Sequence, residues 1–271
     1  MNLAVSNIAW PRDQEHAAAA LLETRGVRGV EIAPSAVWSD PTASSKRERL
    51  EYRRAWERRG IAIVAFQALL YGRPELAIFS GPDARAATMD YLFRLIHLAV
   101  DLGARVLVFG SPGHRRTAGL APREADEIAE TFFRGVGRVG EHYGVQLCIE
   151  PIPRSWGCEF VTTIREGLDL VRRVDSAGFG LHLDAASAAA EPDAASVIRE
   201  AGTVVAHVHA SEPNLAPIGS GGVNHAAFAA ALRRIGYSSW VSIEMRVADR
   251  ERSIDRVDEA LRHARTAYGL T

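Results

Sequence analysis

The stretch that decides the fold runs from ARVLVFG (104–110), through a helical pattern over 123–143, to VQLCIE (145–150). Two short and almost continuously apolar runs flank one long amphipathic segment. Strands buried on both faces have this composition, and parallel sheets covered by helices produce such strands. Gly144 stands directly before the second run, where a glycine can end a helix in the left-handed conformation. We interpret the stretch as one β-α-β unit.

The same alternation continues along the whole chain. We predict eight strands, at residues 3–9, 29–33, 61–66, 105–109, 145–150, 179–184, 204–209 and 240–245. Helical patterns fill the gaps, for example over 83–102, 164–174 and 253–268. Eight such units in 271 residues predict the α/β class and a single (β/α)8 TIM barrel forming one domain over 1–271. An open, doubly wound sheet is the alternative.

The composition narrows the classes of function. The chain carries 32 basic and 33 acidic residues and a net charge of -1, so no basic excess favours a nucleic acid or a membrane surface as partner. The N-terminus lacks the pattern of a signal peptide, and no run of about 18 apolar residues occurs. We therefore expect a cytoplasmic protein, with Cys148 and Cys158 reduced.

Four consecutive predicted strands end in a residue that can bind a metal. They are Glu150, Asp184, His209 and Glu244. In a barrel the reactive groups come from the C-terminal ends of the strands, and three carboxylates with one imidazole suit Mn²⁺, Mg²⁺, Co²⁺ or Zn²⁺. Each residue alone could be a helix cap or a buried core residue. Burying three carboxylates together without a cation would cost several kcal/mol each, which favours one divalent metal ion.

The segments around these residues resemble a known family. CIEPIP (148–153), GLHLDAAS (180–187), AHVHASEPN (206–214) and WVSIEMR (240–246) are similar to strands of the xylose-isomerase-like barrel superfamily. Within it they resemble the ketose 3-epimerases, inosose isomerases and dehydratases, and hydroxypyruvate isomerases. The resemblance implies that the four residues above are the metal ligands, with Mn²⁺ expected first. It also implies a homodimer or a homotetramer.

The resemblance further implies an isomerase or epimerase of a small sugar, cyclitol or related hydroxy-carbonyl compound. Glu150 and Glu244 would be the acid/base pair. One would remove a proton beside a carbonyl, the metal would stabilise the enediolate, and the other would return the proton. Where the sugar epimerases carry a substrate-binding His and Arg, this chain has Ser187 and Leu215, so the substrate is left open.

Further residues are candidate substrate contacts. Glu159 follows the fifth strand and matches a substrate-binding acid of the family. His182 and Arg246 each lie two residues from a predicted ligand and so share its face of the strand. Trp10 could stack on a ring, and Gln67 could bind hydroxyls. Packing in the core is the alternative for His182 and Trp10. The loop SPGHRR (111–116) is interpreted as a solvated basic loop, with binding of a phosphate or carboxylate of the substrate as the alternative.

Three other functions occur on, or are compatible with, the same type of barrel. A lyase or dehydratase acting on a keto-cyclitol or an oxidised glycoside would begin with the same proton abstraction. A non-catalytic partner subunit could keep the metal without turnover. An apurinic-site endonuclease is disfavoured, because Gln67, Ser111 and Ser187 occupy the regions where those enzymes carry extra zinc-binding histidines, and because the basic surface that binds phosphate is missing.

Overall fold

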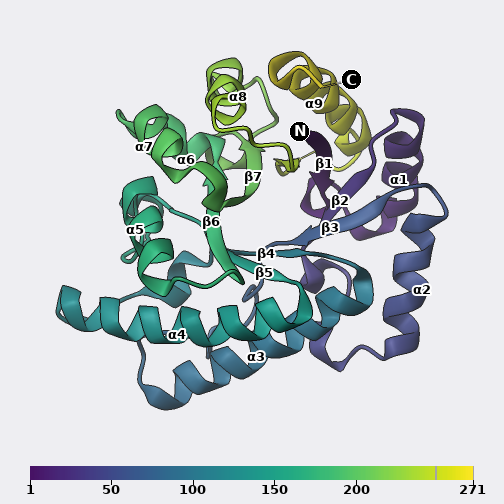
Figure 1. The fold of residues 1–271 in the computed structure, drawn as a ribbon. Coiled ribbons are helices and arrows are strands. Elements are labelled where there is room, and N and C mark those ends of the chain that lie inside the picture. Colours follow the sequence, from purple (N-terminus) through teal and green to yellow (C-terminus); the bar gives the residue numbers. More distant parts are fainter. Residues whose placement is uncertain (248, 271) are drawn as a thin grey trace.

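Eight parallel strands close into a barrel in the computed structural model, which describes residues 1–247 and 249–270 (Figure 1). Neighbouring strands pair in sequence order, and the first pairs with the last. The strands are β1 (Asn2–Ser6), β2 (Gly29–Ile32), β3 (Ala62–Phe66), β4 (Val106–Phe109), β5 (Gln146–Ile149), β6 (Phe179–Asp184), β7 (Val205–Ser211) and β8 (Trp240–Glu244). The predicted (β/α)8 fold is confirmed.

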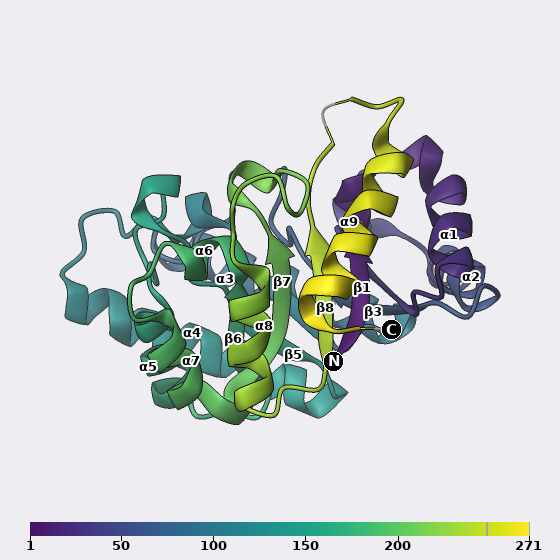
Figure 2. The ribbon, with the colours of Figure 1, turned by 90° about the horizontal axis from the view of Figure 1, so that it is seen from above.

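Helices connect the strands and cover the outside of the barrel. They are α1 (Glu15–Thr24), α2 (Lys46–Glu57), α3 (Pro82–Leu102), α4 (Pro122–Tyr143), α5 (Ile164–Val174), α6 (Ala185–Ala189), α7 (Ala194–Ala201), α8 (His225–Arg234) and α9 (Ser253–Tyr268). Helix α9 packs against β8 and α1 (Figure 2). In the described part of the chain, none of these helices combines the length and the apolar character that crossing a membrane requires.

The unit that decides the fold forms as its sequence predicts. Helix α4 ends at Gly144, whose φ of 65° is the left-handed conformation that glycine adopts without strain. The amide of Val145 then donates to the carbonyl of Gly140, which turns the chain directly into β5. Phe133 of α4 packs between Phe109 of β4 and Phe179 of β6, with ring centroids 5.5 and 4.8 Å away. This apolar layer between strands and helices holds the barrel wall in place.

Two predicted strand ends differ from the structure by more than one residue. The first strand stops at Ser6, because a 3₁₀ helix over Asn7–Ala9 begins there and the Ser6 hydroxyl accepts from the amide of Ile8. The seventh strand continues two residues beyond His209, to Ser211, which pairs with Glu244 of β8. Both differences lie at the C-terminal rim. There the strand ends are set by hydrogen bonds to loops and to neighbouring strands, which local sequence patterns do not predict.

The inside of the barrel contains a polar layer. Glu31, His182, His207, His209 and Ser242 are at most 1% exposed, although all lie on strands. Strand residues alternate between the two faces of a sheet, so these residues face inward while their apolar neighbours face the helices. The polar layer leads upward to the C-terminal rim and forms the floor of the site described next.

Candidate metal centre

Four side chains converge at the C-terminal rim of the barrel. Glu150 directly follows β5, Asp184 ends β6, His209 lies on β7, and Glu244 ends β8. One ligand atom from each lies within 4.8 Å of those of the other three. The strands are adjacent and parallel, so residues at the same height on each strand meet above the barrel axis. A set of three carboxylates and one imidazole at this spacing is suited to a single divalent cation.

Two carboxylates of the cluster have raised pKa values. Burial, together with the nearby charges of Glu244 and Asp184, raises the pKa of Glu150 to about 8. Burial and the charge of Glu244 also raise the pKa of Asp184. The carboxylates therefore repel one another in a place that water screens poorly. A divalent cation between them would remove this repulsion, and the residues present fit such an ion.

His209 lies between two carboxylates. Its Nε2 is 3.0 Å from Oε2 of Glu31, and its Nδ1 is 3.3 Å from Oε2 of Glu244. Burial opposes a positive charge on the ring, but the two carboxylates outweigh it and raise the pKa of His209 well above its usual range. Asp184 is held as well, because its Oδ1 accepts from the amide of Ser187 at 2.7 Å and its Oδ2 accepts from the hydroxyl of Ser211.

A cavity of about 290 Å³ opens above the cluster. Glu150, Asp184 and Glu244 lie in its wall. Its other polar wall residues are Gln67, Ser111, Ser211, Glu212, Asn214 and Arg246, and its larger apolar ones are Ile8, Ile152, Trp156 and Leu215. The cavity has the size of a small-molecule site and brings polar groups and an apolar wall to the same point.

The structure brings two of the predicted substrate contacts to this cavity. Gln67 follows β3, is buried, and donates from its amide to the hydroxyl of Ser6. Arg246 follows β8 with an exposed side chain, and its backbone amide donates to the carbonyl of Leu215 at 2.7 Å. Leu215 thus lies in the wall where the resemblance would place an arginine, whereas Ser187 is buried beside Asp184 and is not a wall residue.

Three other predicted contacts lie away from the cavity wall. The Glu159 carboxylate accepts from the amide and hydroxyl of Thr117, at 2.9 and 3.2 Å, and borders a separate cavity of about 360 Å³. The loop turns away from the rim at Gly157, whose φ is 82°, and leaves Trp156 in the wall instead. His182 lies one strand pleat below Asp184, with its ring 4.2 Å from that of His209, and Trp10 is packed in the apolar core.

Two buried residues near the site were not predicted. Glu31 of β2 contacts His207 and His209 from across the barrel. Arg115 belongs to the loop interpreted as solvated, and that interpretation is wrong for this residue. Its side chain is fully buried and donates to the carbonyls of Glu150 and Phe160, both at 3.0 Å. The period of two in β2 places Glu31 on the inner face, which was a usable signal, but nothing local to the sequence marks Arg115 as buried.

The fold and the residues at its C-terminal rim define the protein as a (β/α)8 barrel with a candidate metal centre at the C-terminal ends of the strands. The sequence model of the xylose isomerase-like TIM barrel family matches residues 19–267, and the chain belongs to this family. The family and the fold agree with the resemblance drawn from the four strand segments.

Curated relatives include two ketose epimerases. The chain is 30% identical over 165 residues to a D-psicose 3-epimerase of Ruminiclostridium cellulolyticum, a match covering 60% of this chain and 55% of the relative. It is 27% identical over 181 residues to an L-ribulose 3-epimerase of Mesorhizobium japonicum, covering 65% and 61%. The matched region thus spans less than two thirds of each relative.

Solved structures share the fold over nearly the whole chain. A D-psicose 3-epimerase from Clostridium cellulolyticum H10, determined with D-tagatose, superposes with a TM-score of 0.84 at 21% identity and covers 99% of both chains. The IolI protein with a bound zinc atom superposes with a TM-score of 0.80 at 19% identity, covering 99% of this chain and 98% of IolI. At these identities the likeness shows the fold.

Proposed function

We propose that the protein is a divalent-metal-dependent epimerase or isomerase of a small sugar, cyclitol or related hydroxy-carbonyl compound. The observation that carries the proposal is the convergence of Glu150, Asp184, His209 and Glu244 within 4.8 Å beneath a small-molecule cavity. The names of the two curated relatives, which are ketose 3-epimerases, support the same class of reaction.

These four residues would hold the metal, and the donor set suits Mn²⁺, with Mg²⁺, Co²⁺ or Zn²⁺ as alternatives. When bound, the ion would polarise the substrate carbonyl and stabilise negative charge that develops on the substrate oxygens. The proposal includes a cytoplasmic location and a homodimer or homotetramer, which fractionation and light scattering would test.

Glu150 and Glu244 would move the proton. They come from β5 and β8, so their carboxyl groups approach the space above the cluster from different sides. One would take the proton from the carbon beside the carbonyl, and the other would return one to the opposite face, which inverts that carbon. Return to the neighbouring carbon would instead interconvert an aldose and a ketose. Gln67 and Arg246 would bind substrate oxygens from the wall.

Solvent-exchange assays test this proposal. The Mn²⁺-loaded protein is incubated in D₂O with a panel of ketoses, aldoses and keto-cyclitols, and the products are followed by NMR. We expect deuterium at the carbon beside the carbonyl of an isomeric product, and its loss in Glu150→Gln and Glu244→Gln. Glu51→Gln is a matched control, because Glu51 is exposed on α2. Absence of exchange on every compound, with metal bound, would refute the proposal.

A second candidate function is elimination from a keto-cyclitol or an oxidised glycoside. Leu215 favours it, because it lies in the cavity wall where the resemblance would place an arginine and cannot pair with the hydroxyls of a free sugar. Proton removal would then be followed by expulsion of water or of an aglycone. The same NMR assay separates the two functions, because elimination converts the substrate into an unsaturated ketone and forms no epimer.

A further inference from the structure

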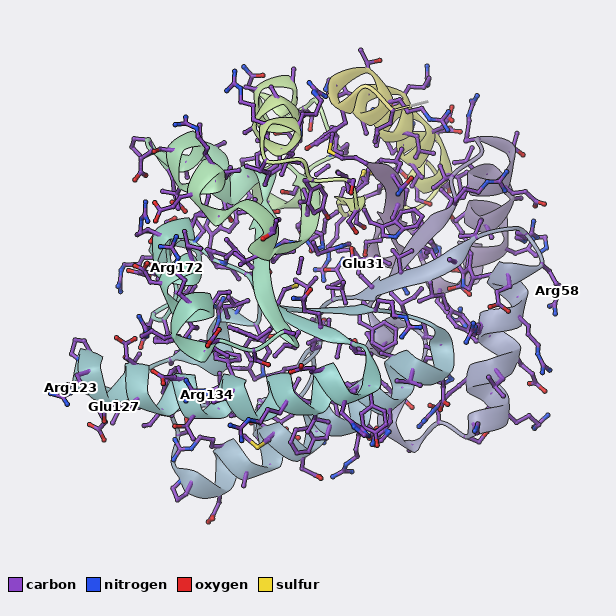
Figure 3. The ribbon with its side chains drawn as sticks, in the orientation of Figure 1. Glu31, Arg58, Arg123, Glu127, Arg134 and Arg172 are labelled. Atoms are coloured by element: carbon purple, nitrogen blue, oxygen red, sulfur yellow. The ribbon has the colours of Figure 1, made fainter. Side chains whose placement is uncertain are left out.

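The most deeply buried carboxylate of the barrel interior lies outside the four proposed ligands. Glu31 is 0% exposed, and Figure 3 shows it inside the ring of strands, whereas other labelled charged residues such as Arg123 and Arg172 lie on the outer helices. Its ion-pair partners among the described residues are His207 and His209. A buried carboxylate without such partners would be strongly disfavoured, so these contacts account for its presence.

The two histidine contacts of Glu31 are unequal. Both of its oxygens lie within hydrogen-bond distance of Nε2 of His209, at 3.1 and 3.0 Å. Nε2 of His207 is 3.4 Å from Oε1 and makes no hydrogen bond in this geometry. An ionised carboxylate only accepts hydrogen bonds, so Nε2 of His209 must carry a hydrogen and donate it. The contact thereby leaves Nδ1 as the ring nitrogen that faces Glu150, Asp184 and Glu244.

We propose that Glu31 is a positioning residue for His209, fixing Nε2 as the protonated nitrogen and presenting Nδ1 as the ligand atom of the metal centre. The inference rests on the metal site of the proposed function. A carboxylate behind a histidine ligand fixes the ring's tautomer and orientation and raises its basicity as a ligand. Here the carboxylate on β2 reaches across the barrel to the histidine on β7. The position of His209 therefore also depends on β2, a strand that contributes no ligand.

An alternative use of the same atoms is a second cation site. Ligand atoms of Glu31, His207 and His209 lie within 4.8 Å of one another. This set shares His209 with the rim cluster and is closed to solvent. A hydrogen bond from His209 to Glu31 explains the observed distances without a second ion, and the stoichiometry of metal binding distinguishes the two arrangements.

Zinc binding to the metal-free protein tests the inference. Isothermal titration calorimetry with Zn²⁺ would compare the wild type with Glu31→Gln, which keeps the shape and loses the charge, and with Glu31→Asp, which keeps the charge and shortens the reach. We expect one ion per chain, a loss of affinity of about 10- to 100-fold in Glu31→Gln, and a smaller loss in Glu31→Asp. Ser242→Ala is the matched control, because Ser242 is a buried register neighbour of His209 and its hydroxyl is unpaired among the described residues.

A spectroscopic measurement separates positioning from simple packing. Long-range ¹H–¹⁵N spectra of the metal-free, ¹⁵N-histidine-labelled protein, recorded at a pH at which the His209 ring is neutral, should show His209 with its hydrogen on Nε2 in the wild type and in Ser242→Ala. In Glu31→Gln this signal should change to the other nitrogen or to a mixture. Unchanged affinity and an unchanged tautomer in folded Glu31→Gln would overturn the inference and leave the proposed function standing. Two ions per wild-type chain, with one lost in Glu31→Gln, would also overturn it, and a wild type that binds no divalent ion would refute both.

Discussion

The carboxylate of Glu150 occupies the space that a side chain at Gly110 would fill. A Cβ atom built on Gly110 would overlap Oε2 of Glu150. Gly110 directly follows β4, and β4 pairs with β5 just before Glu150, so the two residues are neighbours at the rim. The lack of a side chain at position 110 is therefore a condition for Glu150 to reach the proposed metal.

Gly110→Ala should impair the site without unfolding the protein. The obstructing atom is the end of a flexible side chain, so Glu150 can rotate away at little cost to the fold. We expect the free energy of unfolding to change by less than about 1 kcal/mol. Displacement of a catalytic group by about 1 Å can cost roughly 100-fold in rate, and we expect a loss of that order. Urea denaturation would measure the free energy of unfolding, the deuterium-exchange assay the rate, and Mn²⁺ calorimetry the metal affinity.

Gly113→Ala is the control for this substitution. Gly113 lies in the same loop, and a Cβ there would meet no atom within 4 Å. This variant should match the wild type in metal affinity and turnover. If Gly110→Ala binds Mn²⁺ as tightly as Gly113→Ala, then Glu150 does not need its present position and its role as a ligand is wrong.

Metal binding should stabilise the fold, and Asp184→Asn should abolish most of that gain. An ion that binds only the folded state adds about 2.7 kcal/mol at 100 times its Kd, and a chelator should reverse the effect. Without metal, Asp184→Asn should be at least as stable as the wild type, since the neutral amide no longer repels Glu244. Thermal unfolding with Mn²⁺ and with EDTA measures both effects. Asp90→Asn, on an exposed α3 position, should respond to metal like the wild type.

The sequence predicted those features of the fold and site that depend on position along a strand. The apolar runs and helix-ending glycines indicated eight β-α units. Because the reactive groups of a barrel lie at the C-terminal ends of its strands, position alone then identified the candidates Glu150, Asp184, His209 and Glu244. The structure brings these four together, while their role as metal ligands stays a prediction. Features that depend on contacts between distant strands were missed. Glu31 sits in an otherwise apolar strand, and its partners lie across the barrel on β7.

Loops were predicted less well than strands, for a physical reason. The path of a loop depends on a few backbone angles and on partners elsewhere in the chain. Gly157 and Val161, with φ of 82° and 58°, direct the chain after β5 so that Glu159 meets Thr117 instead of the central cavity. Arg115 is buried because it donates to two carbonyls, one at the end of β5 and one in the loop that follows β5. The composition of the loop around Arg115 does not predict these partners.

Arg115→Met should destabilise the rim. The guanidinium donates to the carbonyls of Glu150 and Phe160. Methionine keeps a similar length but leaves the buried Glu150 carbonyl unpaired and the Phe160 carbonyl with only the weak thiol donor of Cys158. Each unpaired buried group costs about 1–3 kcal/mol, so we expect a loss of about 3 kcal/mol in the free energy of unfolding by urea. Arg116→Met is the control, because Arg116 is the exposed neighbour. Equal stabilities of the two variants would show that the buried hydrogen bonds of Arg115 contribute nothing.

The stability of the wild type should fall between pH 5 and pH 8 through Glu191. Its carboxylate accepts from the amide of Ile164 at the start of α5, at 2.9 and 3.1 Å, and burial raises its pKa to about 7. An unfolded glutamate ionises near about 4.3. Between these values the folded state holds more protons than the unfolded state, so the free energy of unfolding falls as pH rises through this window.

The variant Glu191→Gln cannot ionise at this position and should lose this pH-dependent part of the free energy of unfolding. Because Glu191 is partly solvated, we expect the variant to gain only about 1 kcal/mol over the wild type at pH 8 compared with pH 5. Urea denaturation across this range, with the exposed Glu127→Gln as control, would measure the difference. If the free energies of unfolding of the wild type and Glu191→Gln depended on pH in the same way, the Glu191 carboxyl group would titrate alike in the folded and unfolded states, and the prediction would be wrong.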